Sequence, residues 1–403
     1  MARKLPKGWV YRELGDLVRI GSGGTPTRSN ADYWGGAMPW ITAKDIKTFD
    51  LHDSQERLTD AGAQQASVVP ENTVLMLVRG MGLFKDIPIG VTSRPMAFNQ
   101  DVKALHPKEE VTPRFLGYAL QAQRHYLMGN VDHAGHGTGR LQTSIVEELP
   151  LPIPKALDEQ RLIVRVLDAA DRLISLEERL LSQREVRYQS FLKTVLRPLD
   201  QQRAKGWRRV HLGDIFTERD ERSGDLPLLA ITGGHGVVPR DQLERRDTSA
   251  EDKSNYKVIR KGDIGYNTMR MWQGVFGLSA HDGIVSPAYT VVTPDRSRIL
   301  GEFAAHLFSH PHVVHTFHRY SQGLVDDTLL LKYPHFSEIR LPIPDNAEQR
   351  RIAKALDVQL SEVELLRRLV DLRRQQHRGL MQQLLTGQQR LTHDLPGTEP
   401  ANV

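Results

Sequence analysis

Two long stretches of the chain, at about 158–197 and 347–386, share one pattern of hydrophobic and polar positions. Both lack proline, are almost free of glycine, and are rich in Leu, Glu, Arg and Gln. In the second stretch the seam positions follow one another in steps of four and three residues, which is a heptad pattern. These positions are Ile352, Leu356, Gln359, Val363, Leu366, Val370, Arg373, His377, Leu380 and Leu384. The pattern predicts two long helices, each with one stripe to bury.

The first stretch repeats every seven residues, at Leu167, Ile174, Leu181, Tyr188 and Val195. A helix of about 40 residues is roughly 60 Å long, and the other helix is the nearest partner for its stripe. Antiparallel pairing would place the two flanking globules at opposite ends. It would also bring the polar seam positions Glu177 and Arg184 close to Arg373 and His377. Two separate helical hairpins, or coils that bind another protein, are the alternative.

The rest of the chain has short apolar runs between Gly and Pro residues. The runs at 74–78 and 289–292 are typical of strands, whereas 115–127 and 302–308 indicate helices. This mixture predicts globules of the α/β or α+β class before each long helix.

An internal repeat relates the two halves of the chain. Leu-Pro-Ile-Pro at 151–154 and again at 341–344 is followed by a Glu-Gln-Arg tripeptide and then by Leu-Asp. Upstream, Gly-Trp and Leu-Gly-Asp at 8–16 recur with the same spacing at 206–214. Two anchors in the same order indicate two tandem halves of roughly 190–200 residues. The predicted boundaries are a first globule at 1–154, a central helix at 155–200, a second globule at 201–344, a distal helix at 345–390 and a flexible tail at 391–403.

Composition narrows the classes of protein without selecting one. With 403 residues, 39% hydrophobic and 26% charged, the chain suits a multidomain globular protein. The net charge of +5 is compatible with polyanion binding but does not establish it. The absence of cysteine excludes disulfides, thiolate chemistry and Cys-ligated zinc. Since no apolar stretch of about 18 residues occurs, we expect a cytoplasmic protein that is not inserted in a membrane.

Signatures of catalysis are missing. The sequence has no Asn/Asp-Pro-Pro-Tyr/Phe motif for methylation of an exocyclic nitrogen and no Walker motif for nucleotide hydrolysis. Glu251-Asp252-Lys253 has the Glu-x-Lys form of some nucleases, but no Pro-Asp precedes it at a useful distance. We therefore expect no catalytic residues.

Two further clusters have an ordinary structural explanation. Five histidines lie at 306, 310, 312, 315 and 318, a spacing that is compatible with a metal-binding helix face. No Cys, Asp or Glu completes a ligand set nearby, so a helix surface or groove edge is the favoured interpretation, and we predict no metal. The glycine-rich segments 21–26 and 135–140 lack the strand-to-helix setting of a nucleotide site, so we expect backbone turns near phosphates.

The paired Pro-x-Pro, Glu-Gln-Arg and Leu-Asp segments, each preceded by Gly-Trp and Leu-Gly-Asp, resemble the specificity subunits of type I restriction-modification enzymes. Further matches lie at 23–26, 39–41, 98–105 and 267–289. The first globule departs from this pattern, because it has Arg-Gly-Met-Gly-Leu-Phe-Lys at 79–85 where the second has Arg-Met-Trp-Gln-Gly at 270–274. We therefore expect the two globules to recognise different DNA sequences.

The resemblance implies an α+β fold with a pseudo-two-fold repeat, in which two tandem α/β target-recognition domains are separated by two long antiparallel helices that form a coiled-coil spacer. Each domain would recognise one half of a bipartite, asymmetric site in double-stranded DNA. The helices would set the spacing and dock two methylation subunits, and a restriction subunit would join them. S-adenosylmethionine, ATP and Mg²⁺ would be used by those partners and none by this non-catalytic chain. The alternative is a coiled-coil adaptor that joins protein partners without sequence-specific DNA binding.

Side chains that recognise base edges or phosphates are cations and amides on loops. The candidates for DNA binding are Arg79, Lys85, Asn99, Gln100, Arg270, Trp272 and Gln273. The candidates for the helix entry and for subunit docking are Glu159, Gln160, Arg161, Glu348, Gln349 and Arg350.

Overall fold

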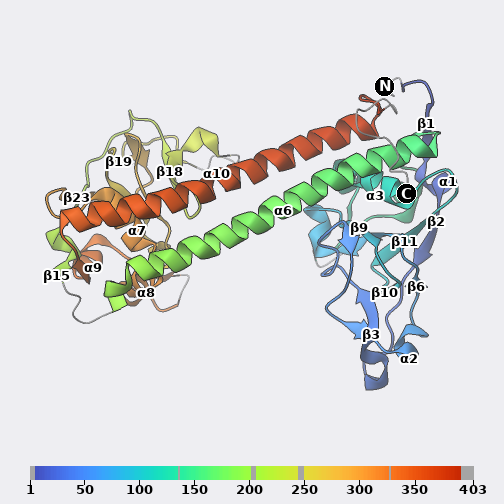
Figure 1. Cartoon of the computed structure of the whole chain (residues 1–403), viewed down its shortest axis with the longest axis horizontal. Helices are drawn as coiled ribbons and strands as arrows, with labels where there is room; N and C mark the ends of the chain where they lie inside the picture. The colour runs from blue at the N-terminus through green and yellow to red at the C-terminus, as the bar shows by residue number, and fades with distance from the viewer. Residues whose placement is uncertain (1–4, 135–136, 201–205, 244–248, 326–327, 392–403) are drawn as a thin grey trace, which may run out of the picture. The chain divides into compact units, whose positions relative to one another are not determined.

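The computed structural model of the chain describes residues 5–134, 137–200, 206–243, 249–325 and 328–391 (Figure 1). Nearly all of the predicted tail at 391–403 lies outside these residues. The chain divides into two compact units. Unit 1 comprises residues 1–177 and 370–403, and unit 2 comprises residues 178–369. Each unit therefore holds one globular domain together with a part of both long helices.

The two long helices occur where the heptad pattern predicts them. Helix α6 spans Leu157–Val195 and helix α10 spans Asn346–Leu385. In unit 1 the start of α6 lies against the end of α10, and in unit 2 the end of α6 lies against the start of α10. The pairing is therefore antiparallel in both units, as predicted. About half of the predicted seam positions are buried and the others are half-buried. The buried ones are Leu167, Tyr188, Ile352, Leu356, Val363, Val370 and Leu384.

The predicted polar layer at mid-helix is only partly correct. Glu177 Oε1 lies 3.3 Å from Arg373 Nε, as expected. Arg184 instead pairs with Glu362, with 3.2 Å between Nε and Oε1. Arg184 follows Glu177 on α6, so in an antiparallel pair its partner must precede Arg373 on α10, as Glu362 does. The charged residues therefore form successive pairs along the helices instead of one layer.

The repeated motifs frame each globular domain. Strand β1 (Trp9–Glu13) pairs with β14 (Pro150–Pro154), and β15 (Arg208–His211) pairs with β24 (Arg340–Ile343), both antiparallel. The repeated Leu-Gly-Asp then turns into a short helix, α1 (Leu14–Leu17) or η4 (Leu212–Asp214). A Cβ added at Gly213 would lie 2.8 Å from that of Ser337, so close packing requires this glycine. The first and last strands of each domain are thus paired with each other.

The domain of unit 1 is built on mainly antiparallel sheets. The five-stranded sheet has the order β2 (Val18–Ser22), β11 (Val102–Pro107), β7 (Val74–Leu77), β9 (Ile89–Thr92) and β4 (Asp50–Leu51). The four-stranded sheet has the order β5 (Arg57–Leu58), β3 (Trp34–Ile41), β10 (Met96–Phe98) and β6 (Val68–Val69). A small sheet joins β12 (Asp132–His133), β13 (Gly139–Arg140) and β8 (Arg79–Gly80). Its helices are α2 (Asp60–Ala63), α3 (Pro113–Ala122), α4 (Arg124–Gly129) and α5 (Thr143–Glu147), with 3-10 turns η1 (Ala31–Tyr33) and η2 (Met81–Phe84).

The domain of unit 2 has smaller sheets. Its largest sheet has the order β16 (Phe216–Glu218), β23 (Tyr289–Pro294), β20 (Ile264–Asn267) and β21 (Phe276–Leu278). Two two-stranded sheets pair β17 (Leu229–Thr232) with β18 (Gly236–Pro239) and β19 (Lys257–Ile259) with β22 (Gly283–Val285). The helical elements are η3 (Arg197–Asp200), η5 (Arg240–Gln242), η6 (Met271–Gln273), α7 (Gly301–Phe308), α8 (Pro311–Tyr320) and α9 (Tyr333–Ser337). Both domains are therefore of the α+β class.

Each unit has its own hydrophobic core, and the long helices take part in both. In unit 1 the domain core includes Leu75, Phe115 and Leu167, and in unit 2 it includes Phe303, Phe336 and Leu356. None of the helices among the described residues is both long and apolar enough to cross a membrane.

Candidate nucleic-acid interface and helix entries

The central glutamine of each Glu-Gln-Arg tripeptide is completely buried and locks the start of a long helix to its domain. Gln160 Oε1 accepts from the Thr112 backbone N–H at 2.8 Å, and its Nε2 donates to the carbonyls of Glu110 (2.9 Å) and Pro154 (3.0 Å). Because both amide hydrogens and the amide oxygen of this buried side chain are bonded to the backbone, its role is structural.

Gln349 repeats this arrangement in unit 2. Its Oε1 accepts from the Leu300 N–H at 2.8 Å, and its Nε2 donates to the carbonyls of Arg298 (3.0 Å) and Pro344 (2.9 Å). Neither glutamine has surface to offer a partner protein, so the repeated motif is explained by the helix entry.

The residues beside the glutamines differ between the two units. Glu159 accepts from Trp9 Nε1 at 3.1 Å and from two nitrogens of Arg390, so it joins the first strand to the end of α10. Glu348 pairs within its own helix, with Arg351. Arg161 and Arg350 are exposed. Docking therefore stays a prediction for the exposed members of the set.

In unit 1, the candidate Arg79 lies in a small cationic sheet. Arg79 on β8 is directly opposite Arg140 on β13, and both side chains are exposed. Asp132 is opposite Arg140 on the other side, but it accepts from Gln142 at 2.6 Å. Like charges in directly opposite positions repel each other, so an anion between them would relieve an unfavourable contact. This geometry suits a phosphate.

Lys85 follows the 3-10 turn η2, which extends from this same sheet. Its side chain is exposed and makes no ion pair with the described residues. Arg140 ends the glycine-rich segment 135–140, two residues of which lie outside the described part of the chain. Arg79, Lys85 and Arg140 thus form a group of cations where we expected a turn near phosphates. The sequence pattern had identified Arg79 and Lys85 as candidates for DNA binding, but not Arg140.

In unit 2, Arg270, Trp272 and Gln273 lie on or beside the 3-10 turn η6. Arg270 Nη1 donates to Gln273 Oε1 at 3.2 Å, which holds the two exposed side chains next to each other. The indole of Trp272 donates to the Met269 carbonyl at 3.0 Å and lies edge-on to His318. The turn ends at Gly274, whose φ of +76° is left-handed and favours glycine.

These two candidate groups occupy equivalent places in the two domains. The Leu141 N–H donates to the Val78 carbonyl in unit 1, and the Leu331 N–H donates to the Thr268 carbonyl in unit 2. Each of these bonds fixes the segment after a central strand, β7 or β20, against the segment that precedes the last short helix. The two domains therefore present different side chains from equivalent positions.

Asn99 and Gln100 have different surroundings. Asn99 is 8% exposed, and its side chain bonds to the backbone N–H and the carboxylate of Asp101. Gln100 is exposed and accepts from Thr25 Oγ1 at 2.6 Å, beside the glycine-rich turn 21–26. A Cβ at Gly23 would lie 2.2 Å from the Asn99 carbonyl oxygen, so these two turns are packed backbone against backbone.

The histidine cluster contributes to packing around η6 and α7. His310 is the N-cap of α8, His315 and His318 stack at 6.3 Å, and His306 is buried in unit 2. Among the residues that the structure describes, no three His, Cys, Asp or Glu side chains are grouped so as to hold a metal ion.

Unit 2 also has an open groove of about 720 Å³ between the start of α7 and the first half of α10. Its lining includes Arg350 and two strongly exposed apolar residues, Val358 and Leu365. Leu365 is 65% exposed and Leu176 is 61% exposed. Both leucines lie sixteen residues after the buried glutamine of their own unit, so the repeat presents the same apolar side chain twice.

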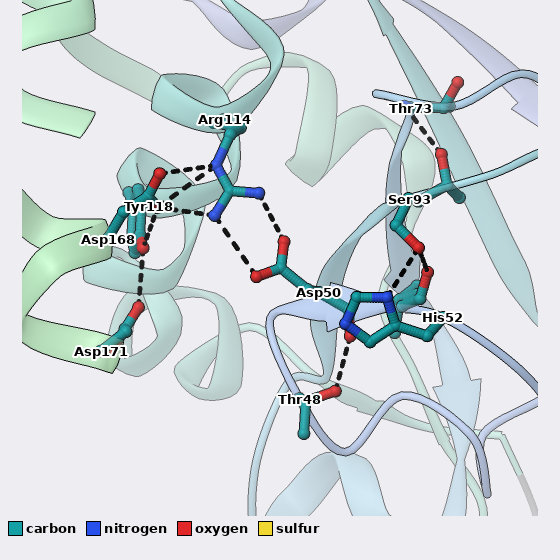
Figure 2. Close-up of polar contacts among 11 residues, drawn as sticks. Thr48, Asp50, His52, Thr73, Ser93, Arg114, Tyr118, Asp168 and Asp171 are labelled. Carbon is teal, nitrogen blue, oxygen red and sulfur yellow. Dashed lines mark hydrogen bonds and ion pairs between the residues drawn. The ribbon is translucent and has the colours of Figure 1, made fainter. Parts of the chain in front are cut away.

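A polar cluster that the candidate set did not include lies where α3 meets α6 in unit 1 (Figure 2). Arg114 bonds to Asp168, with 2.6 Å between Nη2 and Oδ1, and also to Asp50. Burial opposes the charge of this guanidinium, but its bonds to Asp50 and Asp168 outweigh that effect and raise the pKa of Arg114. The repeated Leu-Asp after Glu-Gln-Arg, which contains Asp168, was the sequence signal for this cluster.

Comparison with known proteins gives a consistent result. Residues 6–185 match the family described as the type I restriction modification DNA specificity domain. The chain is 27% identical over 264 residues to the specificity subunit of the MjaIX type I restriction enzyme of Methanocaldococcus jannaschii. It is 25% identical over 166 residues to that of EcoR124I/EcoR124II from Escherichia coli. These matches cover 59% and 40% of this chain and 57% and 41% of the relatives.

Solved structures show the likeness of fold over nearly the whole chain. The type I restriction-modification S subunit of M. genitalium has a TM-score of 0.57 at 14% identity, covering 97% of this chain and 99% of that one. A chain from a structural study of complex assembly and conformational transition in the type I R-M system has a TM-score of 0.58 at 15% identity. That match covers 96% of this chain and 100% of that one.

Proposed function

Since the chain belongs to the family of type I restriction-modification DNA specificity subunits, which are non-catalytic, we propose that its two domains each recognise one half of a bipartite, asymmetric DNA site. The main support for this proposal is that the two domains present different polar side chains from equivalent positions of their folds. Arg79, Lys85 and Arg140 serve one half-site, and Arg270, Trp272 and Gln273 serve the other. Gln100 lies at a second exposed turn, and the buried Asn99 shapes that turn.

The partners follow from the same proposal. Two methylation subunits bind the helices, and a restriction subunit joins the assembly. S-adenosylmethionine, ATP and Mg²⁺ act in those subunits. The two units each present an exposed leucine, Leu176 or Leu365, from the same position of the repeat. Equivalent surfaces suit two copies of one partner, since each copy can make the same contacts.

The function is tested by expressing the chain with its cognate methylation subunits in a host without adenine methylation and mapping methylated adenines across the genome. The expected result is one motif made of two unrelated half-sites and a fixed spacer. A salt titration on random and genomic duplexes tests binding directly, since phosphate contacts weaken as salt rises. Absence of sequence-selective retention at moderate salt would favour the adaptor that joins proteins only.

Substitutions at the two cationic turns are expected to act on one half-site each. Arg270→Ala or Gln273→Ala weakens discrimination in one half, and Arg79→Ala or Lys85→Ala acts on the other. Loss of a base-edge contact costs on the order of 1–3 kcal/mol and relaxes one position, whereas loss of a phosphate contact weakens all sequences alike. The measurement is equilibrium binding to duplexes with single base changes.

The matched control is Arg260→Ala in unit 2, because Arg260 is already paired with Glu221 and Asp282. This variant should bind like the parent. If Arg79→Ala altered discrimination in the half-site assigned to unit 2, the assignment of one domain to one half would be wrong.

Replacing an exposed leucine by glutamate is expected to prevent the binding of one methylation subunit. Leu365→Glu or Leu176→Glu places a carboxylate in the proposed apolar contact and should leave one methylation subunit per chain, and the double variant should leave none. Native mass spectrometry of the assembly gives the subunit count. Since both side chains are exposed, the free chain should keep its thermal stability, and Ser182→Glu, which adds a carboxylate at an exposed position of α6, is the surface control. Two methylation subunits retained by the double variant would disprove the contact.

A further inference from the structure

In unit 1, one tyrosine connects the helix of the globular domain to the long helices. Tyr118 on α3 is completely buried, and its hydroxyl lies 2.7 Å from Asp168 Oδ1 and 2.7 Å from Asp171 Oδ2, both on α6 (Figure 2). The other oxygen of Asp171 lies 3.4 Å from Nε2 of His377 on α10. Three helices thus meet at one set of polar groups, which we call linkage 1: Tyr118, Asp168, Asp171 and His377.

Unit 2 has a corresponding set, linkage 2, made of Tyr188, His306 and Asp357. His306 on α7 is 3% exposed. Its Nδ1 lies 3.0 Å from the hydroxyl of Tyr188 on α6, and its Nε2 lies 2.8 Å from Asp357 Oδ1 on α10. Here too, a short helix of the domain is joined to both long helices.

The two linkages occupy the same positions of the internal repeat. Asp168 and Asp357 each lie eight residues after the buried glutamine of their unit, and Tyr188 and His377 each lie 28 residues after it. Tyr118 lies six residues after Thr112, whose N–H binds Gln160, and His306 lies six after Leu300, whose N–H binds Gln349. Tyrosine and histidine have therefore exchanged places between the units, while both stay in contact with a carboxylate-bearing helix.

Both ring nitrogens of His306 are hydrogen-bonded in linkage 2. A carboxylate accepts only, so His306 donates from Nε2 to Asp357, while its Nδ1 is hydrogen-bonded to the Tyr188 hydroxyl. Burial raises the pKa of Tyr188 to about 12, so this hydroxyl keeps its proton near neutral pH. The hydrogen bonds among these three groups are directional, in contrast to the apolar contacts around them.

In linkage 1 two carboxylates converge on one hydroxyl, and each also faces a nitrogen-bearing side chain. Asp168 is paired with Arg114, and Asp171 faces His377. Burial, and then the bonds to Asp171 and Asp168, raises the pKa of Tyr118, so this hydroxyl also remains a donor. Both linkages therefore connect a domain to two long helices. Linkage 2 does so through the two hydrogen bonds of His306, and linkage 1 does so through the hydrogen bonds of the Tyr118 hydroxyl to α6 and the 3.4 Å contact between Asp171 and His377.

We propose that the two linkages are positioning sites, which fix the angle at which each recognition domain is held on the long helices and thereby keep the DNA spacer at one length. This inference rests on the proposed function. Apolar packing tolerates small rotations of a helix because it has little directionality, whereas a buried hydrogen bond is lost when its partners move apart. Retention of polar groups in a helix interface for register has precedent in coiled coils.

The test uses the full chain with its methylation subunits and maps methylated adenines. Tyr188→Phe removes a single oxygen and leaves the packing intact, and Tyr118→Phe does the same in unit 1. We expect unchanged half-sites, with methylation at sites whose spacer is one base pair longer or shorter rising about tenfold relative to the parental spacer. The control Tyr266→Phe removes a buried hydroxyl from β20, inside the domain of unit 2.

A second control separates positioning from stability. Val292→Ala in β23 lowers the stability of unit 2 without touching either linkage, and it should leave one spacer length. His306→Tyr alone should broaden the spacer. Combining it with Tyr188→His and Leu360→Asp rebuilds the linkage 1 set in unit 2 and should restore a single spacer.

The outcomes are distinct. A parent chain that methylates no bipartite motif contradicts the proposed function and this inference together. A parent with a bipartite motif, whose Tyr188→Phe and Tyr118→Phe variants keep one spacer length, contradicts the positioning role alone. The same conclusion follows if the rebuilt set behaves like His306→Tyr, or if Val292→Ala broadens the spacer equally.

Discussion

Replacing Gln349 by leucine is expected to lower the free energy of unfolding of unit 2 by about 3–5 kcal/mol, since three buried hydrogen bonds are lost together. Leucine has a similar volume, so the packing at the helix entry remains while the Leu300 N–H and two carbonyls lose their partner. Hydrogen exchange measured by mass spectrometry should show faster exchange in α7 and at the start of α10. The variant Gln160→Leu should have the same effect in unit 1.

The neighbouring residue supplies the control. Arg350 is exposed and makes no hydrogen bond with the described residues, so Arg350→Ala should change stability by less than about 0.5 kcal/mol. A loss below about 1 kcal/mol for Gln349→Leu would mean that water replaces the amide, and the entry would not depend on this side chain.

The second large effect concerns the spacer of the DNA motif. Four residues inserted after Ser182 in α6, together with four after Leu369 in α10, add about one turn, or roughly 6 Å, to both helices. The flanking pairs Glu177–Arg373 and Glu185–Arg367 stay within their own units. We expect the methylated motif to keep both half-sites and to gain roughly one to two base pairs of spacer, given about 3.4 Å per base pair.

An insertion of four residues after Glu251, in an exposed loop of unit 2, should leave the spacer unchanged. If the doubly inserted chain methylates the parental motif with an unchanged spacer, the helices do not set the distance. Loss of methylation at all sites, with both units still folded, would also contradict the expectation.

The long helices and the repeat were predictable because their signals are local. A heptad stripe needs only residues within the same helix, and absence of proline over such a length leaves few alternatives. The partners of the polar seam residues were harder to predict. The sequence marks Arg184 as polar, but its partner, Glu362, depends on the register of two helices that are far apart in the chain.

The functional meaning of the Glu-Gln-Arg tripeptides was less accessible. A repeated polar tripeptide at a helix start fits both docking and anchoring, and only the burial of Gln160 and Gln349 distinguishes these roles. The pairing of Arg79 with Arg140 and the two linkages were also beyond sequence patterns, because their members come from separate segments. Tyr188 and His377 looked like imperfect seam residues until their contacts were known.

The pairing of the first and last strands of each domain has a consequence for inheritance. Because β1 lies beside β14 and β15 beside β24, the chain enters and leaves a domain through two adjacent strands. Everything between those strands can differ without moving the ends, as the unlike sheets of the two domains demonstrate. On the proposed function, we therefore expect a gene segment bounded by these strands to be transferable, so that recombination between two such genes would create a new combination of half-sites in one step.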